Sequence, residues 1–115
     1  MTSPHAIPTV TVDQVPVPVP DPVVVVDVRE DDEWQAGHIV GARHIPLSQL
    51  PERAGELVDA THVLCVCRVG ARSARATVLL RRTGVDAVNL HGGMYGWAAA
   101  GNPMVSETGQ EPEVR

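Results

Sequence analysis

Phenylalanine is absent from the sequence, and aromatic residues of all kinds amount to only 3%. Apolar residues still make up 43% of the 115 positions, and valine dominates them. Because β-branched side chains favour extended backbone, much of the hydrophobic core is expected to lie in a β-sheet. A chain of this length corresponds to one domain and can bury one core.

Lysine is also absent, so all nine basic residues are arginine, and the formal net charge is −5. An acidic chain has no general attraction for nucleic acid, which favours a basic surface. Arginine keeps its charge and binds oxyanions through a rigid fork of donors. We therefore expect no nucleic-acid partner, and a high-GC genome is the main explanation for arginine in place of lysine.

Long apolar runs are missing as well, since none approaches the ~20 residues needed to cross a bilayer. The first ten residues lack the charged region and apolar stretch of a signal peptide. The two cysteines, Cys65 and Cys67, are too few for a disulfide framework. The simplest interpretation is a cytoplasmic protein with free thiols and no membrane partner.

Valine runs, glycines and prolines divide the chain into alternating strands and helices. Strands are expected at residues 9–12, 23–28, 42–45, 62–66 and 87–90, and helices at residues 30–36, 48–56, 73–82 and 93–100. This alternation predicts an α/β fold, a parallel sheet with helices on both faces. Residues 1–8 are expected to form a flexible N-terminal arm, residues 9–104 the domain and residues 105–115 a polar C-terminal tail.

Cys67 is the strongest candidate for a functional residue because it follows a buried strand and precedes a helix. In parallel α/β folds, ligands bind beyond the carboxyl ends of the strands. A loop that enters a helix directs its backbone N–H groups at one point, which favours an anion and lowers the pKa of a thiol there. From this loop alone, a reactive thiolate and an inert buried thiol are equally open interpretations.

The other sulfur and nitrogen ligands of the chain do not predict a metal site. Cys65 lies inside an apolar strand, so we expect a packed core thiol without a function. The spacing of His62, Cys65, Cys67 and His91 matches no usual zinc pattern. We therefore expect neither a metal nor a cofactor.

The segment CRVGARS at residues 67–73 resembles the active-site loop of rhodanese-like domains, in which a cysteine begins a six-residue loop that ends in arginine and is followed by serine. Two further segments resemble signatures of the same family. They are VVDVREDDEWQAGHIVGARHIPL at residues 25–47 and VNLHGGMYGWAAAGNPM at residues 88–104. The resemblance covers about residues 9–104 and implies a central parallel sheet of about five strands flanked by helices.

The resemblance also implies a reaction, in which the Cys67 thiolate takes sulfur from a small-molecule donor such as thiosulfate and passes it to a thiol or to cyanide. The resulting persulfide would be held by the loop residues Arg68, Val69, Gly70, Ala71, Arg72 and Ser73. Asp27 and Arg43 match family positions on the active-site side. A buried Asp–Arg pair that holds strands together is an equally open interpretation.

Several residues of the signatures have structural interpretations. Arg72 could brace the loop instead of contacting substrate, and Trp97 is expected to pack the last helix onto the sheet. His38 and His44 are expected to be structural. Arg68 is a departure from the family, many of whose single-domain members have an uncharged residue directly after the cysteine. A cation there is expected to favour anionic donors.

Two other functions compete with a free-standing sulfurtransferase. A sulfur-relay or regulatory module would use the same persulfide but pass it to a protein partner. Phosphatases and arsenate reductases with a related fold have five residues between cysteine and arginine, whereas only four separate Cys67 from Arg72. A smaller loop suits sulfur better than a tetrahedral phosphate.

Overall fold

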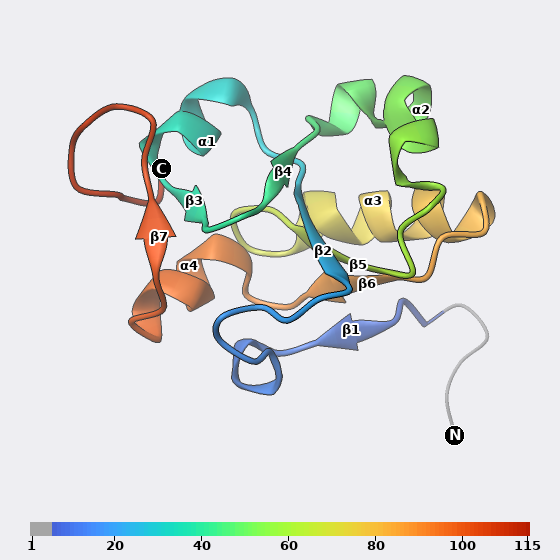
Figure 1. Cartoon of the computed structure of the whole chain (residues 1–115), viewed down its shortest axis with the longest axis horizontal. Helices are drawn as coiled ribbons and strands as arrows, with labels where there is room; N and C mark the ends of the chain where they lie inside the picture. The colour runs from blue at the N-terminus through green and yellow to red at the C-terminus, as the bar shows by residue number, and fades with distance from the viewer. Residues whose placement is uncertain (1–5) are drawn as a thin grey trace.

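A computed structural model of the chain describes residues 6–115 and contains a five-stranded parallel sheet with helices on both sides (Figure 1). The strands lie in the order β1–β6–β5–β2–β4. Their bounds are Thr9–Val10 for β1, Val23–Asp27 for β2, Arg43–His44 for β4, His62–Val66 for β5 and Ala87–Leu90 for β6. The predicted α/β fold with a central parallel sheet is confirmed.

Four α-helices accompany this sheet in the described part of the chain. They are α1 (Asp31–Ala36), α2 (Leu50–Arg53), α3 (Ala71–Arg82) and α4 (Gly93–Ala99). Three short 3-10 turns, η1 (Val12–Gln14), η2 (Leu47–Gln49) and η3 (Ala54–Leu57), complete the connections. None of these helices is long and apolar enough to cross a membrane, within the residues that the structure describes.

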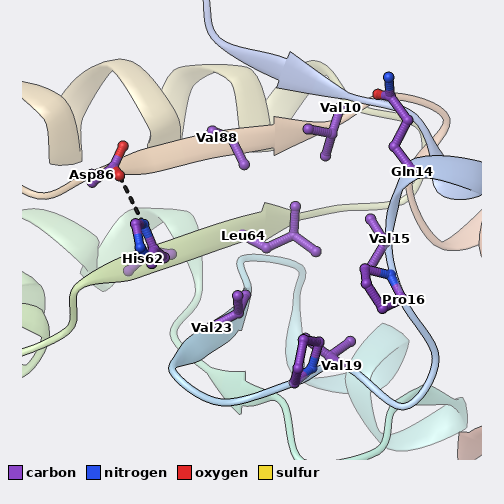
Figure 2. Close-up of a pocket in the computed structure, with 12 residues that line it drawn as sticks. Val10, Gln14, Val15, Pro16, Val19, Val23, His62, Leu64, Asp86 and Val88 are labelled. Atoms are coloured by element: carbon purple, nitrogen blue, oxygen red, sulfur yellow. Dashed lines mark hydrogen bonds and ion pairs between the residues drawn. The ribbon is translucent and has the colours of Figure 1, made fainter.

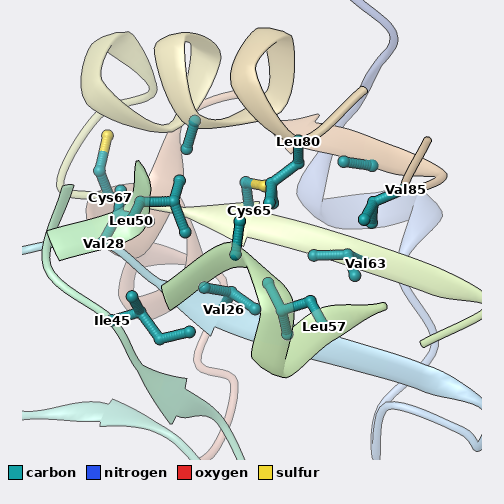
Figure 3. Close-up of a cluster of buried hydrophobic side chains, with 13 residues drawn as sticks. Val26, Val28, Ile45, Leu50, Leu57, Val63, Cys65, Cys67, Leu80 and Val85 are labelled. Atoms are coloured by element: carbon teal, nitrogen blue, oxygen red, sulfur yellow. The ribbon is translucent and has the colours of Figure 1, made fainter. Parts of the chain in front are cut away.

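The two faces of the sheet carry separate hydrophobic clusters because side chains alternate along each strand. On one face, Val26 and Cys65 pack with side chains of α2 and α3 (Figure 3). On the other face, Val25 and Leu64 pack with α4, whose Trp97 is only 1% exposed. The predicted role of Trp97, which was to pack the last helix onto the sheet, is confirmed.

Element boundaries differ from the predictions where local turns compete with regular structure. The strand expected at residues 9–12 ends at Val10, because a 3-10 turn begins at Val12. The helix expected at residues 48–56 is split into 3-10, α and 3-10 turns. Helix α3 begins at Ala71 instead of residue 73, so the last residues of the cysteine loop are already helical.

A second, small sheet was not predicted. Strand β3 (His38–Ile39) pairs antiparallel with β7 (Met104–Val105), which brings the end of the chain beside α1 (Figure 1). Two-residue strands have no periodicity of their own to detect. Their pairing depends on the folded domain, which places the two segments next to each other.

The segment predicted as a polar tail folds back onto the domain. The backbone amides of Glu107 and Glu113 donate hydrogen bonds to the carbonyls of Gln35 and Ala36, at 2.8 and 2.9 Å. Val114 packs against the cluster beneath α4. At the other end of the chain, most of the predicted N-terminal arm lies outside the described residues.

Gly37, directly after α1, is in close contact with the returning C-terminal segment. A Cβ atom at this position would lie 2.5 Å from the carbonyl oxygen of Glu113 and 2.7 Å from the Cε atom of Met104. Gly37 has an extended backbone with φ of 173°, which any residue can adopt. Glycine is therefore required here by the close approach of the C-terminal segment.

We predict that Gly37→Ala lowers the free energy of unfolding by about 1–3 kcal/mol, because the new methyl group must displace the C-terminal segment. Urea unfolding measured by circular dichroism tests this. Gly55→Ala is the matched control, since its Cβ meets no atom within 4 Å and its φ is not positive. Equal stability of the Gly37→Ala variant and the wild type would contradict the tight packing of this segment.

Candidate active site

Cys67 lies directly after β5, at the carboxyl edge of the sheet and ahead of α3. Its residue is only 1% exposed, and it stands at one end of the cluster that contains Cys65 (Figure 3). A sulfur at this place must find hydrogen-bond donors in the protein, because little water reaches it.

The loop supplies those donors. The backbone N–H of Gly70 and the hydroxyl of Ser73 donate hydrogen bonds to Cys67 Sγ at 3.1 and 3.2 Å. Gly70 can turn its amide inward because it adopts a φ of 119°, which a residue with a Cβ rarely adopts. Of the loop residues predicted from the sequence, Gly70 and Ser73 are therefore two whose donors bond this sulfur atom.

These contacts change the acidity of the thiol. Burial raises the pKa of Cys67, but hydrogen bonds from the Ser73 hydroxyl and from the amides of Ser73, Gly70 and Val69 outweigh it. The pKa consequently lies below the ordinary value for cysteine. Cys65 is the opposite case, since burial in the core raises its pKa to about 11.

Arg72 closes the loop by bonding to α1. Its two terminal nitrogens donate to the two carboxylate oxygens of Glu33 at 2.6 and 2.8 Å. The hydrogen bonds from Arg72 lower the pKa of Glu33, although partial burial opposes them. Of the two roles considered for Arg72, the geometry favours bracing, because its donors face Glu33.

Helix α4 holds the loop from the other side. The amides of Met94 and Tyr95 donate to the carbonyls of Cys67 and Arg68 at 2.8 and 3.0 Å. A Cβ atom on Gly93 would collide with both carbonyl oxygens. Gly93, the second glycine of the pair in the C-terminal signature, therefore permits close contact between α4 and the cysteine loop.

Asn89 on β6 is a site residue that sequence reasoning missed. Its side-chain Nδ2 donates to the carbonyl of Gly70 at 3.3 Å, and its Oδ1 accepts from the hydroxyl of Ser73. Asn89 is only 7% exposed. The available signal was an amide in an otherwise apolar buried strand, since such a side chain requires partners.

Asp27 and Arg43 do not form an ion pair, so that interpretation is wrong. The carboxylate of Asp27 is bound by Arg29 through Nε at 2.9 Å and Nη2 at 2.7 Å, and both residues are buried. Arg29 also donates to the carbonyl of Gly37 at 2.7 Å. Arg43 is exposed on the edge strand β4. The pairing is with the arginine two residues along the same chain segment.

His38 and His44, the histidines of the signature at residues 25–47, stack on Trp34. The ring of Trp34 stacks on His38 with centroids 3.5 Å apart and on His44 at 4.9 Å. One ring nitrogen of His38 is bonded to the Trp34 carbonyl, and one of His44 is bonded to the Arg29 carbonyl. These contacts tie α1 to β3 and β4, which fits the structural role expected for both histidines.

Arg68 and Val69 form the outer surface of the loop, and both are exposed. The Nε of Arg68 donates to the backbone oxygen of Arg115 at 3.1 Å. The groups that lower the pKa of Cys67 most are the amides and the Ser73 hydroxyl. Arg68 therefore lies at the loop surface, on the side where the C-terminal segment ends.

A cavity with a largely apolar lining lies elsewhere on the molecule. A cavity of about 320 Å³ is bordered by the proline-rich segment and by β2, β5 and β6, with His62 bonded to Asp86 at one end (Figure 2). Its lining includes Val10, Val19, Leu64 and Val88 but no residue of the cysteine loop. This cavity is therefore separate from the cysteine loop.

Comparison with known proteins agrees with this geometry. A family model described as the rhodanese-like domain matches residues 14–100. A sulfurtransferase from Allochromatium vinosum is 38% identical over 88 residues, which are 76% of this chain and 82% of that protein. The crystal structure of a rhodanese-like domain protein from Staphylococcus aureus has a TM-score of 0.73 at 31% identity, and covers 93% of this chain and 99% of its own.

Another relative is considerably longer than the region of similarity. The uncharacterised protein YqhL of Bacillus subtilis is 45% identical over 73 residues, which are 63% of this chain and 58% of that protein. The chain thus matches little more than half the length of this relative. The similarity therefore concerns the domain, and any function of the remainder of such proteins is a separate question.

We predict that Cys67 is alkylated by iodoacetamide with a pH midpoint below the ordinary value of about 8.5, because only the thiolate reacts and its donors favour the anion. Peptide mapping by mass spectrometry assigns the modified cysteine at each pH. Cys65 serves as the internal control and should stay unmodified in the native protein. A Cys67 midpoint at or above 8.5 would contradict the role assigned to the loop donors.

Proposed function

The chain belongs to the rhodanese-like family, and from this premise we propose that it transfers sulfur through a persulfide carried on Cys67. The family and the sulfurtransferase name of a relative support sulfur transfer in general. The observation that carries the assignment to this residue is the set of hydrogen-bond donors around Cys67 Sγ, which lowers the pKa of its thiol.

The first half-reaction loads the sulfur. The Cys67 thiolate attacks the outer sulfur of thiosulfate, the sulfur–sulfur bond of the donor breaks, and sulfite leaves with the bonding electron pair. No general base is needed once the cysteine is a thiolate. The negative charge moves to the terminal sulfur of the new persulfide, which the loop amides stabilise as fixed donors.

The second half-reaction transfers the terminal sulfur of the persulfide to an acceptor. A thiolate or cyanide attacks the terminal sulfur, the persulfide bond breaks, and Cys67 leaves as a thiolate. A leaving thiol with a lowered pKa departs faster. The hydrogen bonds from Gly70 and Ser73 therefore assist both halves of the cycle, because they raise the fraction of thiolate that can attack and stabilise the thiolate that leaves.

A phosphatase-like reaction is less compatible with the loop. Phosphate transfer needs donors that surround the oxygens of a tetrahedral group, and arginine is well suited to this because of its planar fork. Here both terminal nitrogens of Arg72 face Glu33. Together with the four-residue spacing to Cys67, this leaves sulfur as the better substrate.

The decisive experiment is to incubate the purified protein with thiosulfate, weigh it intact by mass spectrometry, then add cyanide and measure thiocyanate. We expect the wild type to gain one sulfur atom and to release thiocyanate in repeated cycles. Cys67→Ala should do neither, and the matched control Cys65→Ala should do both. Loading on Cys65, or no loading by any sulfane sulfur donor, would contradict the proposal.

The same experiment separates an enzyme from a relay module. Loading of Cys67 with steady thiocyanate production supports a free-standing sulfurtransferase. Loading with little turnover supports a module that passes its sulfur to a protein partner. Thiosulfate can be replaced by polysulfide or glutathione persulfide to identify the donor, since all three present an outer sulfur to the thiolate.

We further propose that Arg68 favours anionic donors, because it is exposed at the loop surface. For a contact between exposed charges worth about 0.2–1 kcal/mol, Arg68→Ala should raise the KM for thiosulfate about 1.5- to 5-fold at low salt, with little change in kcat. The difference should shrink as salt is added. Arg82→Ala, which removes another exposed charge, at the far end of α3, is the control. Equal KM values for the two variants would contradict this role.

A further inference from the structure

The hydroxyl of Ser73 has two acceptors and only one proton. Its Oγ lies 3.2 Å from Cys67 Sγ and 2.5 Å from Asn89 Oδ1. A serine hydroxyl donates a single hydrogen bond, so it serves one of these acceptors at a time. Ser73 is fully buried and Asn89 nearly so, which makes the choice between the two acceptors energetically important.

The orientation of Asn89 is set by the loop itself. Its Nδ2 donates to the carbonyl of Gly70 at 3.3 Å, and its backbone amide donates to the carbonyl of Pro8 at 2.8 Å. A flipped side chain would place two acceptor oxygens against each other at Gly70. Asn89 therefore presents an acceptor oxygen, and not a donor, to Ser73.

We propose that Asn89 is a positioning residue that acts through Ser73, its amide oxygen competing with Cys67 Sγ for the single hydroxyl proton. Neutral sulfur is a weak acceptor and an amide oxygen a strong one, so the proton is donated to Asn89 whenever the sulfur carries no charge. When the sulfur is a thiolate, a hydrogen bond to the anion is the stronger one, and the hydroxyl turns toward it.

The consequence for catalysis rests on the proposed sulfur transfer. Cys67 Sγ is an anion before loading, whereas in the persulfide it is a neutral sulfur with two single bonds. The strength with which it attracts the Ser73 hydroxyl proton therefore alternates through the cycle. Asn89 accepts the proton in the persulfide state, and no buried hydroxyl is left without a partner. In the thiolate state the competition limits how far the anion is stabilised, which preserves nucleophilicity because this falls with the pKa of a thiol.

Two substitutions of Asn89 separate this role from a structural one, read out by the pH dependence of Cys67 alkylation. Asn89→Leu has a similar size and no acceptor, so Ser73 should donate to Cys67 alone and the midpoint should fall by roughly 0.5–1 pH unit. Asn89→Asp is a stronger acceptor and should raise the midpoint. A residue that merely supports the loop would move both midpoints upward.

The competition requires Ser73, which provides the control. In a Ser73→Ala background, Asn89→Leu should leave the midpoint unchanged, and Asn89→Asp should keep only the direct effect of its charge. The groups of other elements that act on the site, Cys65 on β5, Arg72 on α3 and Glu33 on α1, are retained in every variant. Circular dichroism verifies folding. If Asn89→Leu does not fold, the midpoint shift caused by Asn89→Asp, measured with and without the Ser73 hydroxyl, decides the outcome.

Opposite shifts that vanish or shrink without the Ser73 hydroxyl support the inference. Shifts in the same direction, or equal shifts with and without that hydroxyl, overturn it. Because alkylation uses no sulfur donor, the result is independent of whether thiosulfate loads Cys67. Failure of the proposed function and failure of this inference are therefore distinguishable.

Discussion

A buried sulfur anion is the constraint on which the rest of the site depends. Cys67 is almost inaccessible to water, so each hydrogen bond that stabilises its thiolate must come from a group fixed in the protein. Backbone amides and one hydroxyl meet this need, but only while the loop keeps a single shape. The surrounding elements consequently act as supports for that shape.

Three supports reach the loop from different parts of the chain. Helix α4 binds the carbonyls of Cys67 and Arg68, α1 holds Arg72 through Glu33, and β6 contributes Asn89 beneath Gly70. The two flanking signatures are thereby explained as parts of one assembly. Their glycines and charged residues are needed where these elements touch the loop or each other.

The two cysteines illustrate how position within a strand decides chemistry. Both side chains belong to the same cluster and are separated by one residue. Cys65 packs inside this cluster, and burial raises its pKa to about 11, although a hydrogen bond from Thr77 opposes the shift. Cys67 stands where the strand ends and amides become available, so the same kind of side chain is poised to ionise. The end of the sheet is therefore what makes one thiol suited to sulfur chemistry.

The sequence by itself determined the α/β alternation, the strand before Cys67 and the loop around it, because periodicity and glycine placement report local backbone and burial. Tertiary structure alone decided the partners. Asp27 pairs with Arg29 and not with Arg43, and Asn89 on β6 contacts Ser73 on α3. The C-terminal segment packs through backbone hydrogen bonds, side-chain contacts to His38 and Arg68, and Val114, which its polar composition conceals. Such contacts depend on which segments the fold brings side by side. A sequence pattern does not report the distance in space between segments that are far apart along the chain.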